Sequence, residues 1–178
     1  MNLVVVGTGY VGLVTGTCFA EMGNQVACVD VDQQKLDRIT SGQLPIHEPG
    51  LDDLVAKNIA SGRLTFTSDL TLAVKDVDVI FVAVGTPAGE DGNADLTHVL
   101  AVAEQIGNAI NAPVVIAGKS TVPVGTAARV KATIQKVLNK RRMSVLFDVV
   151  SNPEFLREGS AISDFMYPDR IVVGTSEP

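Results

Sequence analysis

Near the N-terminus, the spacing of three glycines indicates a binding site for a pyrophosphate. Gly7, Gly9 and Gly12 form the pattern G-x-G-x-x-G directly after the apolar run at residues 3–6. In this pattern the first glycine permits a tight turn, the second lets the backbone approach the pyrophosphate, and the third lets a helix pack close to a sheet. The free N–H groups and the positive dipole end of that helix would hold the phosphates. The alternative interpretation is that the glycines only form a turn.

A carboxylate follows at the position where a ribose would lie. Asp30 stands 18 residues after Gly12, at the end of the apolar run at residues 26–29. A carboxylate there accepts hydrogen bonds from the adenosine ribose hydroxyls and repels a 2′-phosphate, and no arginine follows directly, so NAD is favoured over NADP. The alternative is that Asp30 only caps the next helix. Lys35 either reaches the same ribose or is a solvated helix residue, and the sequence favours neither interpretation.

Polar side chains also follow three later apolar runs. These polar clusters lie at residues 85–87, 119–123 and 151–159, and they follow the runs at residues 79–84, 113–117 and 145–150. Because the carboxyl ends of parallel strands meet at one edge of a sheet, and ligands bind there, we predict that the clusters form one site. Ordinary turns and helix caps use the same residue types and remain the alternative for any single cluster.

Two carboxylates in the last cluster admit two interpretations. Glu154 and Glu158 are four residues apart, so on a helical turn they would share one face, where like charges repel unless something uses them. A carboxylate beside a nicotinamide would act as a general base or hold a proton-relay water. Acidic residues at a helix N-terminus equally favour the helix dipole. From the residues alone, the two interpretations are even.

The elements that must position these residues alternate between strand and helix. The apolar runs are short and rich in β-branched residues, which is typical of strands buried on both faces. They lie at residues 3–6, 26–29, 79–84, 113–117, 145–150 and 171–173, with a weaker run at 64–66. Stripes with helical spacing separate many of them, and two long loops lie at residues 41–50 and 85–95. The pattern predicts an α/β domain over residues 1–178, with a doubly wound, mostly parallel Rossmann-type sheet and helices on both faces.

Composition excludes several classes of protein. A chain of 178 residues with 46% hydrophobic residues is long and apolar enough to form a core, unlike a disordered segment. A net charge of −6 does not fit a nucleic-acid-binding domain, which usually has a basic face. No apolar run approaches the roughly 18–20 residues of a membrane span, and we find no secretory signal. Cys18 and Cys28 fit neither a disulfide framework nor a metal site, so we expect buried thiols, no metal and a cytoplasmic protein.

Six segments resemble, in order, the motifs of the UDP-glucose/GDP-mannose dehydrogenase family. The family motifs are GxGYVGL, P-x-x-EPGL, VGTP, KSTVPVGT, NPEFLREG and (Y/N)PDR, and the matching segments lie at residues 7–13, 45–51, 84–87, 119–126, 152–159 and 167–170. Within the family, the segments at residues 119–126 and 167–174 are more similar to the members that act on UDP-glucose than to those that act on GDP-mannose. The resemblance runs from one end of the chain to the other.

This resemblance implies a reaction and a set of site residues. Such enzymes oxidise the C6 alcohol of the sugar to a carboxylate, here UDP-glucose to UDP-glucuronate, with two NAD⁺ and with capture of an aldehyde by a cysteine thiolate. By motif match, the cofactor-binding residues would be Gly7, Gly9, Tyr10, Val11, Gly12, Asp30, Lys35, Thr86, Thr121 and Glu158. The catalytic residues would be Thr121 and Glu154, and the residues bordering the UDP-sugar would be Glu154, Phe155, Leu156 and Arg157.

The resemblance also indicates that part of the enzyme is absent. The family's catalytic lysine and its nucleophilic cysteine, in a GGSCFPKD-like stretch, have no match here, so the chain is expected to be the N-terminal NAD-binding part of a longer enzyme and to bind NAD without turnover. Full-length members would form homodimers or larger assemblies largely through the missing central region, whereas this fragment would be monomeric. The alternatives are a GDP-mannose or other UDP-sugar dehydrogenase, a 6-phosphogluconate or 3-hydroxyacid type oxidoreductase, or a non-catalytic NAD-sensing module.

Overall fold

A six-stranded parallel sheet forms the centre of the structure, a computed structural model that describes residues 1–89 and 92–175. The strand order is β3-β2-β1-β4-β5-β6, and every neighbouring pair is parallel. The strands are β1 (Asn2–Val6), β2 (Gln25–Val29), β3 (Leu64–Thr67), β4 (Val79–Val82), β5 (Val114–Gly118) and β6 (Phe147–Ser151). The predicted doubly wound sheet is therefore confirmed, and all of its six strands are parallel.

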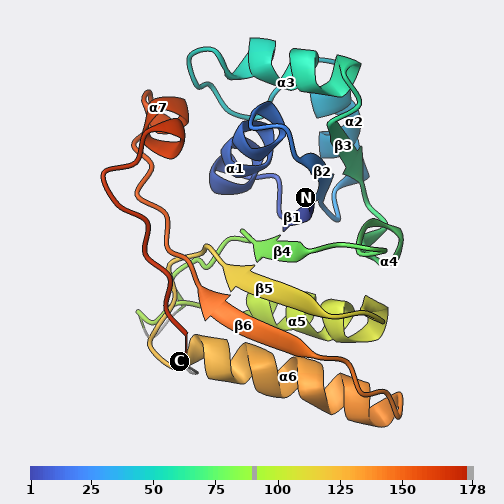
Figure 1. Ribbon diagram of the computed structural model, residues 1–178. Helices are drawn as coiled ribbons and strands as arrows, with labels where there is room; N and C mark the ends of the chain where they lie inside the picture. Colours follow the sequence, from blue (N-terminus) through green and yellow to red (C-terminus); the bar gives the residue numbers. More distant parts are fainter. Residues whose placement is uncertain (90–91, 176–178) are drawn as a thin grey trace.

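Helices cover both faces of this sheet. They are α1 (Tyr10–Glu21), α2 (Gln33–Thr40), α3 (Leu51–Ala60), α4 (Leu70–Ala73), α5 (Thr97–Ala109), α6 (Thr126–Lys140) and α7 (Ala161–Met166). The core on one face is shared by α1, α2, α3 and α7, and the core on the other face by α4, α5 and α6. In Figure 1 the first group occupies the upper half, and α5 and α6 lie along the lower half.

Residues 3–6 of β1 and 79–82 of β4 are apolar at every position because neighbouring side chains enter two different cores. Val4 and Ile80 belong to the core beneath α5 and α6, whereas Val5 and Phe81 belong to the core beneath α1. All but Phe81 are at most 1% exposed, and Phe81 is 9% exposed. A strand buried on both faces has no solvent-facing positions, which explains the continuous runs in the sequence.

The strand order reverses at β1, which lies between β2 and β4. At such a switch point the connections leave in opposite directions and open a crevice at the carboxyl ends of the strands, where ligands bind. Val6 is level with Val29 and Val82 in the register, so the glycine-rich loop, Asp30 and the loop after β4 start from the same edge. The arrowheads of β4, β5 and β6 mark this edge on the left of Figure 1.

Three features differ from the sequence-based expectations. The predicted strand at residues 171–173 is wrong: these residues are exposed, and only the next residue, Gly174, forms a bridge, antiparallel to Ser151. The chain pairs with β6 only after this apolar run, at the last residue of that strand, so the run itself forms no ladder. The short helices α4 and α7 were not predicted, because they contain too few turns to show a periodicity.

The long loop at residues 85–95 contains a bridge between Ala88 and Ala94. Residues 90 and 91 of this loop lie outside the described residues. Among the helices of the described ranges, none is long and apolar enough to cross a membrane.

Candidate functional site

The turn between β1 and α1 leaves the N-terminus of α1 open. Gly7 adopts φ +99°, and a Cβ atom there would lie 2.6 Å from the carbonyl oxygen of Ala83, so only glycine fits this turn. Within the described residues, no side chain caps α1, and its first turn contains no acidic residue. The first helical hydrogen bond runs from Leu13 N to Gly9 O at 2.9 Å. The N–H groups of the preceding helical residues therefore have no partner inside the helix and can bind an anion.

The other two glycines of the motif have different surroundings. A Cβ atom on Gly12 would lie 1.8 Å from the carbonyl oxygen of Gly7, whereas a Cβ atom on Gly9 would meet no described atom within 4 Å beyond its chain neighbours. Gly12 is thus required for packing, and Gly9 leaves space open beside the helix N-terminus. A fourth glycine, Gly16, was missed by the motif: its Cβ would lie 2.4 Å from the Cys28 sulfur. Its position four residues after Gly12, on the same helix face, was the available signal.

Asp30 organises the end of β2. It is 8% exposed, and its Oδ2 atom accepts hydrogen bonds from Thr8 N at 2.8 Å and Thr8 Oγ1 at 2.7 Å. Its Oδ1 atom accepts one from Asp32 N at 3.1 Å, and Lys35 forms an ion pair with Asp30. Burial alone would raise the pKa of Asp30, yet Lys35 and the Thr8 donors hold that pKa below its ordinary value. The ionised carboxylate therefore connects the glycine-rich loop to α2.

These contacts bear on two alternatives that the sequence left open. Helix α2 is capped by Asp32, whose Oδ1 accepts from Lys35 N at 3.0 Å, so Asp30 is not the cap of this helix. Lys35 is paired with Asp30 rather than only solvated. Both side chains lie together at the end of β2, where the sequence predicts an adenosine ribose.

We expect Asp30→Asn to weaken NADH binding by about 10–100-fold, because a hydrogen bond to a charged acceptor is worth about 1.5–3 kcal/mol. The free energy of unfolding should also fall by about 1–3 kcal/mol, since the amide nitrogen would face the donors of either Thr8 or Asp32 and can accept from neither. A fluorescence titration with NADH and a urea unfolding curve measure the two effects. Asp53→Asn, on the exposed surface of α3, is the matched control and should change neither. Unchanged NADH affinity in Asp30→Asn would contradict the assignment.

The loops after β4 and β5 are tied to each other. Thr86 Oγ1 donates to the carbonyl oxygen of Thr121 at 2.9 Å, and Ser120 Oγ donates to the carbonyl oxygen of Val84 at 2.7 Å. Thr121 itself is exposed, and it lines an apolar cavity of about 370 Å³ that is bordered by residues of α5, α6, β5 and β6. The two predicted nicotinamide-side threonines are thus brought together by a side-chain-to-backbone contact.

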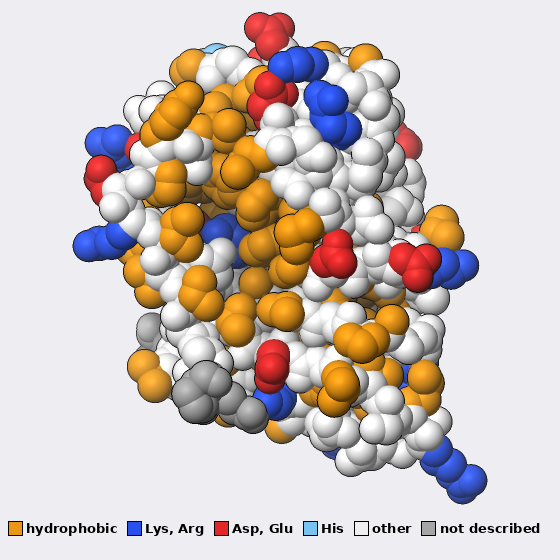
Figure 2. All heavy atoms as spheres, in the orientation of Figure 1, with side chains coloured by type: hydrophobic (Ala, Val, Ile, Leu, Met, Phe, Trp, Pro, Cys, Tyr) orange, Lys and Arg blue, Asp and Glu red, His pale blue; other side chains and the backbone are white. Residues whose placement is uncertain are grey.

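The loop after β6 borders a second, larger cavity of about 820 Å³. Glu154, Phe155, Leu156 and Arg157 all line it, as do residues of α1 and α7. Figure 2 shows apolar side chains gathered in a hollow on this face of the molecule. The four residues predicted to border the substrate therefore share one cavity. Thr121 lines the other cavity, and Pro153 is the only described residue that borders both. The placement of Thr121 with Glu154 at one reacting carbon therefore stays a prediction.

Lys119 is a polar residue of this second cavity that motif matching did not single out. It is 6% exposed, and its Nζ donates to Asn152 Oδ1 at 3.1 Å. Burial lowers the pKa of Lys119, and the carboxylate of Glu154 opposes that shift. The ammonium of Lys119 and the carboxylate of Glu154 therefore interact at this cavity. The signal in the sequence was a charged residue directly after an apolar strand.

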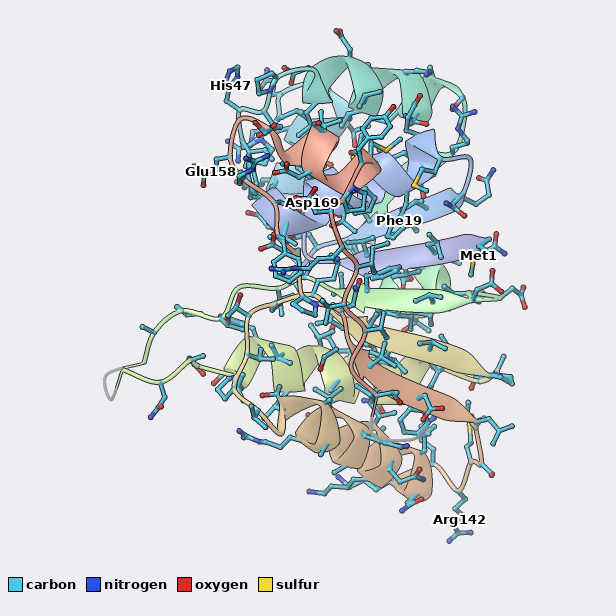
Figure 3. All side chains as sticks on the ribbon, turned by 60° about the vertical axis from the view of Figure 1, so that its left-hand side comes forward. Met1, Phe19, His47, Arg142, Glu158 and Asp169 are labelled. Atoms are coloured by element: carbon cyan, nitrogen blue, oxygen red, sulfur yellow. The ribbon has the colours of Figure 1, made fainter. Side chains whose placement is uncertain are left out.

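Glu154 and Glu158 do not share a helical face. Residues 152–157 are not helical, and Glu154 Oε2 accepts from Leu156 N at 2.5 Å. Glu158 is exposed and lies at the outer edge of the loop, on the same side as His47 (Figure 3). Pro153 and Gly159, which has φ +84°, bound the segment and disfavour a regular helix through it. Because the segment is not helical, the four-residue spacing does not place the two carboxylates on one face.

Arg157 is held by a bidentate ion pair with Asp164 of α7. Its Nη2 atom lies 2.7 Å from Asp164 Oδ1, and its Nε and backbone N–H both donate to Oδ2. The carboxylate raises the pKa of Arg157, and the pKa of Asp164 is lowered in return. Arg170 lies over the ring of Phe155, 4.9 Å from the centroid. Two guanidinium groups thus stand at the cavity that Glu154 borders.

Glu48 is a buried residue to which the sequence assigned no role. It is 2% exposed, and its Oε2 atom accepts from Tyr10 Oη at 2.6 Å and Gly159 N at 2.8 Å. Its Oε1 atom accepts from Ala161 N at 2.8 Å. Burial acts to raise the pKa of Glu48, but these three donors hold it below the ordinary value. The signal was the EPGL loop motif, which does not indicate what the glutamate contacts.

The two cysteines are unsuited to nucleophilic catalysis. Cys18 and Cys28 are free and buried, and burial raises the pKa of each thiol to about 12. A thiol with such a pKa is almost entirely protonated at neutral pH and reacts poorly. Among the residues that the structure describes, no group of three or more His, Cys, Asp or Glu side chains could hold a metal ion.

Comparison with known proteins gives consistent matches over the whole chain. Residues 1–178 match the UDP-glucose/GDP-mannose dehydrogenase family, NAD binding domain. A UDP-glucose 6-dehydrogenase of Pseudomonas aeruginosa is 53% identical over 177 residues, which cover 99% of this chain and 39% of that protein. The structure of a ternary complex of GDP-mannose dehydrogenase from Pseudomonas aeruginosa has a TM-score of 0.92 at 39% identity, covering 98% of this chain and 41% of that one. A UDP-glucose dehydrogenase from Pyrobaculum islandicum has a TM-score of 0.89 at 42% identity, with 98% and 40% covered.

Proposed function

The chain belongs to the UDP-glucose/GDP-mannose dehydrogenase family. We therefore propose that it is part of an enzyme that oxidises the C6 alcohol of UDP-glucose to the carboxylate of UDP-glucuronate. The chain covers 39% of the length of its Pseudomonas aeruginosa relative, and residues 1–178 would be the N-terminal NAD-binding part of such a longer enzyme. One observation carries the proposal: the open N-terminus of α1, Asp30 and the Glu154 loop all lie at the carboxyl edge of the sheet.

The cofactor-binding residues fit NAD. The pyrophosphate would bind the N–H groups of Tyr10, Val11 and Gly12, which have no partner inside the helix, while the open space at Gly9 permits its approach. Asp30 would accept from the ribose hydroxyls, and its negative charge disfavours the 2′-phosphate of NADP. When bound, NAD⁺ accepts the hydride removed from the substrate. The nicotinamide side would be lined by Thr86, Thr121 and Glu158.

Glu154 would hold or activate a water beside the reacting carbon. It borders the larger cavity, and the buried Lys119 lines the same cavity. The UDP-sugar would lie against Phe155, Leu156 and Arg157, which line the same cavity. Thr121 would orient the same water from the neighbouring loop. The nucleophilic cysteine would come from outside this chain, since Cys18 and Cys28 are buried.

We also propose a cellular compartment and an oligomeric state for the enzyme. The longer protein would be a cytoplasmic homodimer or larger assembly, and the isolated chain would be a monomer that binds NAD without turnover. Two buried free thiols are consistent with a reducing compartment. GDP-mannose is the second candidate substrate, because the GDP-mannose dehydrogenase structure has a TM-score of 0.92. A non-catalytic NAD-sensing module would have no use for Glu154 in a cavity.

The isolated chain is expected to bind NADH at least about 10-fold more tightly than NADPH, because Asp30 would repel the 2′-phosphate. Fluorescence titrations with both nucleotides measure the ratio. The longer protein should then reduce NAD⁺ with UDP-glucose and much more slowly with GDP-mannose. Equal binding of NADPH would overturn the cofactor assignment, and a faster reaction with GDP-mannose would overturn the choice of sugar.

A further inference from the structure

We propose that Glu48 is a positioning residue that couples the cofactor end of the site to the loop that carries Glu154 and Glu158. The inference rests on the proposed function, because it needs a dinucleotide at the N-terminus of α1. The relevant contacts join segments that are far apart in the chain. Glu48 contacts Tyr10, 38 residues before it, and the N–H groups of Gly159 and Ala161, 111 and 113 residues after it.

The burial of Glu48 makes this junction sensitive to the loss of any one donor. A buried carboxylate is tolerated only when hydrogen bonds replace its water. Oε1 receives one donor and Oε2 receives two, and all three come from outside the 41–50 loop. Without them the burial of Glu48 would be unfavourable, so the three segments hold one another in place.

One end of the junction is the proposed cofactor site. Tyr10 is the first residue of α1, and its backbone belongs to the open helix N-terminus. A pyrophosphate bound there would restrict the backbone of Tyr10 and, through its ring, the position of the hydroxyl. The hydroxyl donates to Glu48 at 2.6 Å. Binding at the backbone is therefore transmitted to the carboxylate.

The other end is the Glu154–Glu158 loop. Gly159 directly follows Glu158, and its positive φ reverses the chain before α7 begins at the fully buried Ala161. Glu48 accepts from both of these backbone N–H groups, so it determines where the loop ends. A dinucleotide that restricts Tyr10 would thus reduce the opening of this loop, and by linkage an ordered loop would favour the dinucleotide.

Hydrogen exchange of individual amides in the 178-residue chain, measured by NMR with and without NADH, tests the coupling. We expect NADH to slow exchange at Gly159 and Ala161 by about 5-fold or more, the lower end of ordinary coupling energies. Tyr10→Phe, which keeps the ring and loses only the hydroxyl, should remove this protection. Glu48→Gln should remove it as well and weaken NADH binding by about 5-fold.

Two controls separate positioning from a general loss of stability. Glu104→Gln makes the same chemical change on the exposed surface of α5 and should behave like the wild type. Val55→Ala removes buried methyl groups from α3, so it destabilises the domain while leaving every contact of Glu48 in place. NADH-dependent protection of Gly159 and Ala161 should persist in both controls.

The outcomes distinguish the coupling from the proposed function. Protection that persists in Tyr10→Phe, or that is lost equally in Val55→Ala, overturns the role of Glu48. NADH that shifts the Gly9 and Gly12 amide signals but leaves Gly159 and Ala161 unchanged overturns the coupling alone. If NADH shifts no amide signal of the wild type, both the proposed cofactor binding and the coupling are refuted.

Discussion

Replacing Glu154 by glutamine is expected to lower the turnover of the longer protein by about 100-fold or more, because a positioned general base contributes about 10²–10⁴ in rate. Glutamine keeps the size of the side chain and can still accept from Leu156 N through its amide oxygen, so the loop should keep its shape. It cannot take a proton from water. The rate of NAD⁺ reduction with UDP-glucose measures the effect.

Two further measurements make this expectation specific. NADH binding by the 178-residue variant should equal that of the wild type, since Glu154 lines the cavity on the substrate side and not the N-terminus of α1. Glu104→Gln is the matched control and should keep full turnover. Full activity in Glu154→Gln would refute its proposed role, and a parallel loss of NADH binding would indicate a cofactor contact instead.

Gly12→Ala is expected to lower the free energy of unfolding by about 3 kcal/mol or more, at the upper end of the usual cost of overpacking. The added Cβ would lie 1.8 Å from the carbonyl oxygen of Gly7. Because this oxygen belongs to the backbone, it cannot rotate away as the end of a side chain could. Displacement of α1 would also misplace the N–H groups for the pyrophosphate. Urea unfolding and an NADH titration should both show the loss.

Gly9→Ala provides the contrast within the same motif. Its Cβ would meet no described atom within 4 Å beyond its chain neighbours, and the backbone at Gly9 has φ −74°, which alanine adopts readily. We therefore expect a stability change below about 1 kcal/mol, as for other substitutions at a helix N-cap. The methyl group would occupy the space through which a pyrophosphate approaches, so NADH binding should fall by about 10-fold or more. A Gly9→Ala variant with wild-type NADH affinity would place the pyrophosphate elsewhere.

Much of the architecture could be predicted because it depends on local patterns. Five strongly apolar runs and the weaker run at residues 64–66 became strands. The central strands β1 and β4 are apolar because both of their faces are covered, whereas the edge strand β6 carries the exposed Asp148. The run at residues 171–173 has the same composition yet is exposed. Composition cannot tell whether a neighbouring strand is available for pairing, because this depends on where α7 directs the chain.

Some features of the candidate site could likewise be predicted from local sequence, and others could not. The G-x-G-x-x-G pattern and Asp30 could be located in the sequence because the turn, the helix start and the strand end that they occupy are set by neighbouring residues. The orientations of Glu154 and Glu158 could not, since their spacing indicated one shared face and the extended loop separates them. The pairing of Asp30 with both Thr8 and Lys35 likewise required the folded chain.

The sequence by itself determined three features of the candidate site: a parallel sheet, a glycine-rich turn before a helix, and a carboxylate at the end of the second strand. These follow from steric and hydrophobic rules that act within about 20 residues. Only the tertiary structure decided which side chains meet at that site. Glu48 shows the reason most clearly, because the N–H groups that stabilise its buried charge lie 111 and 113 residues away, and no local pattern encodes a contact over that distance.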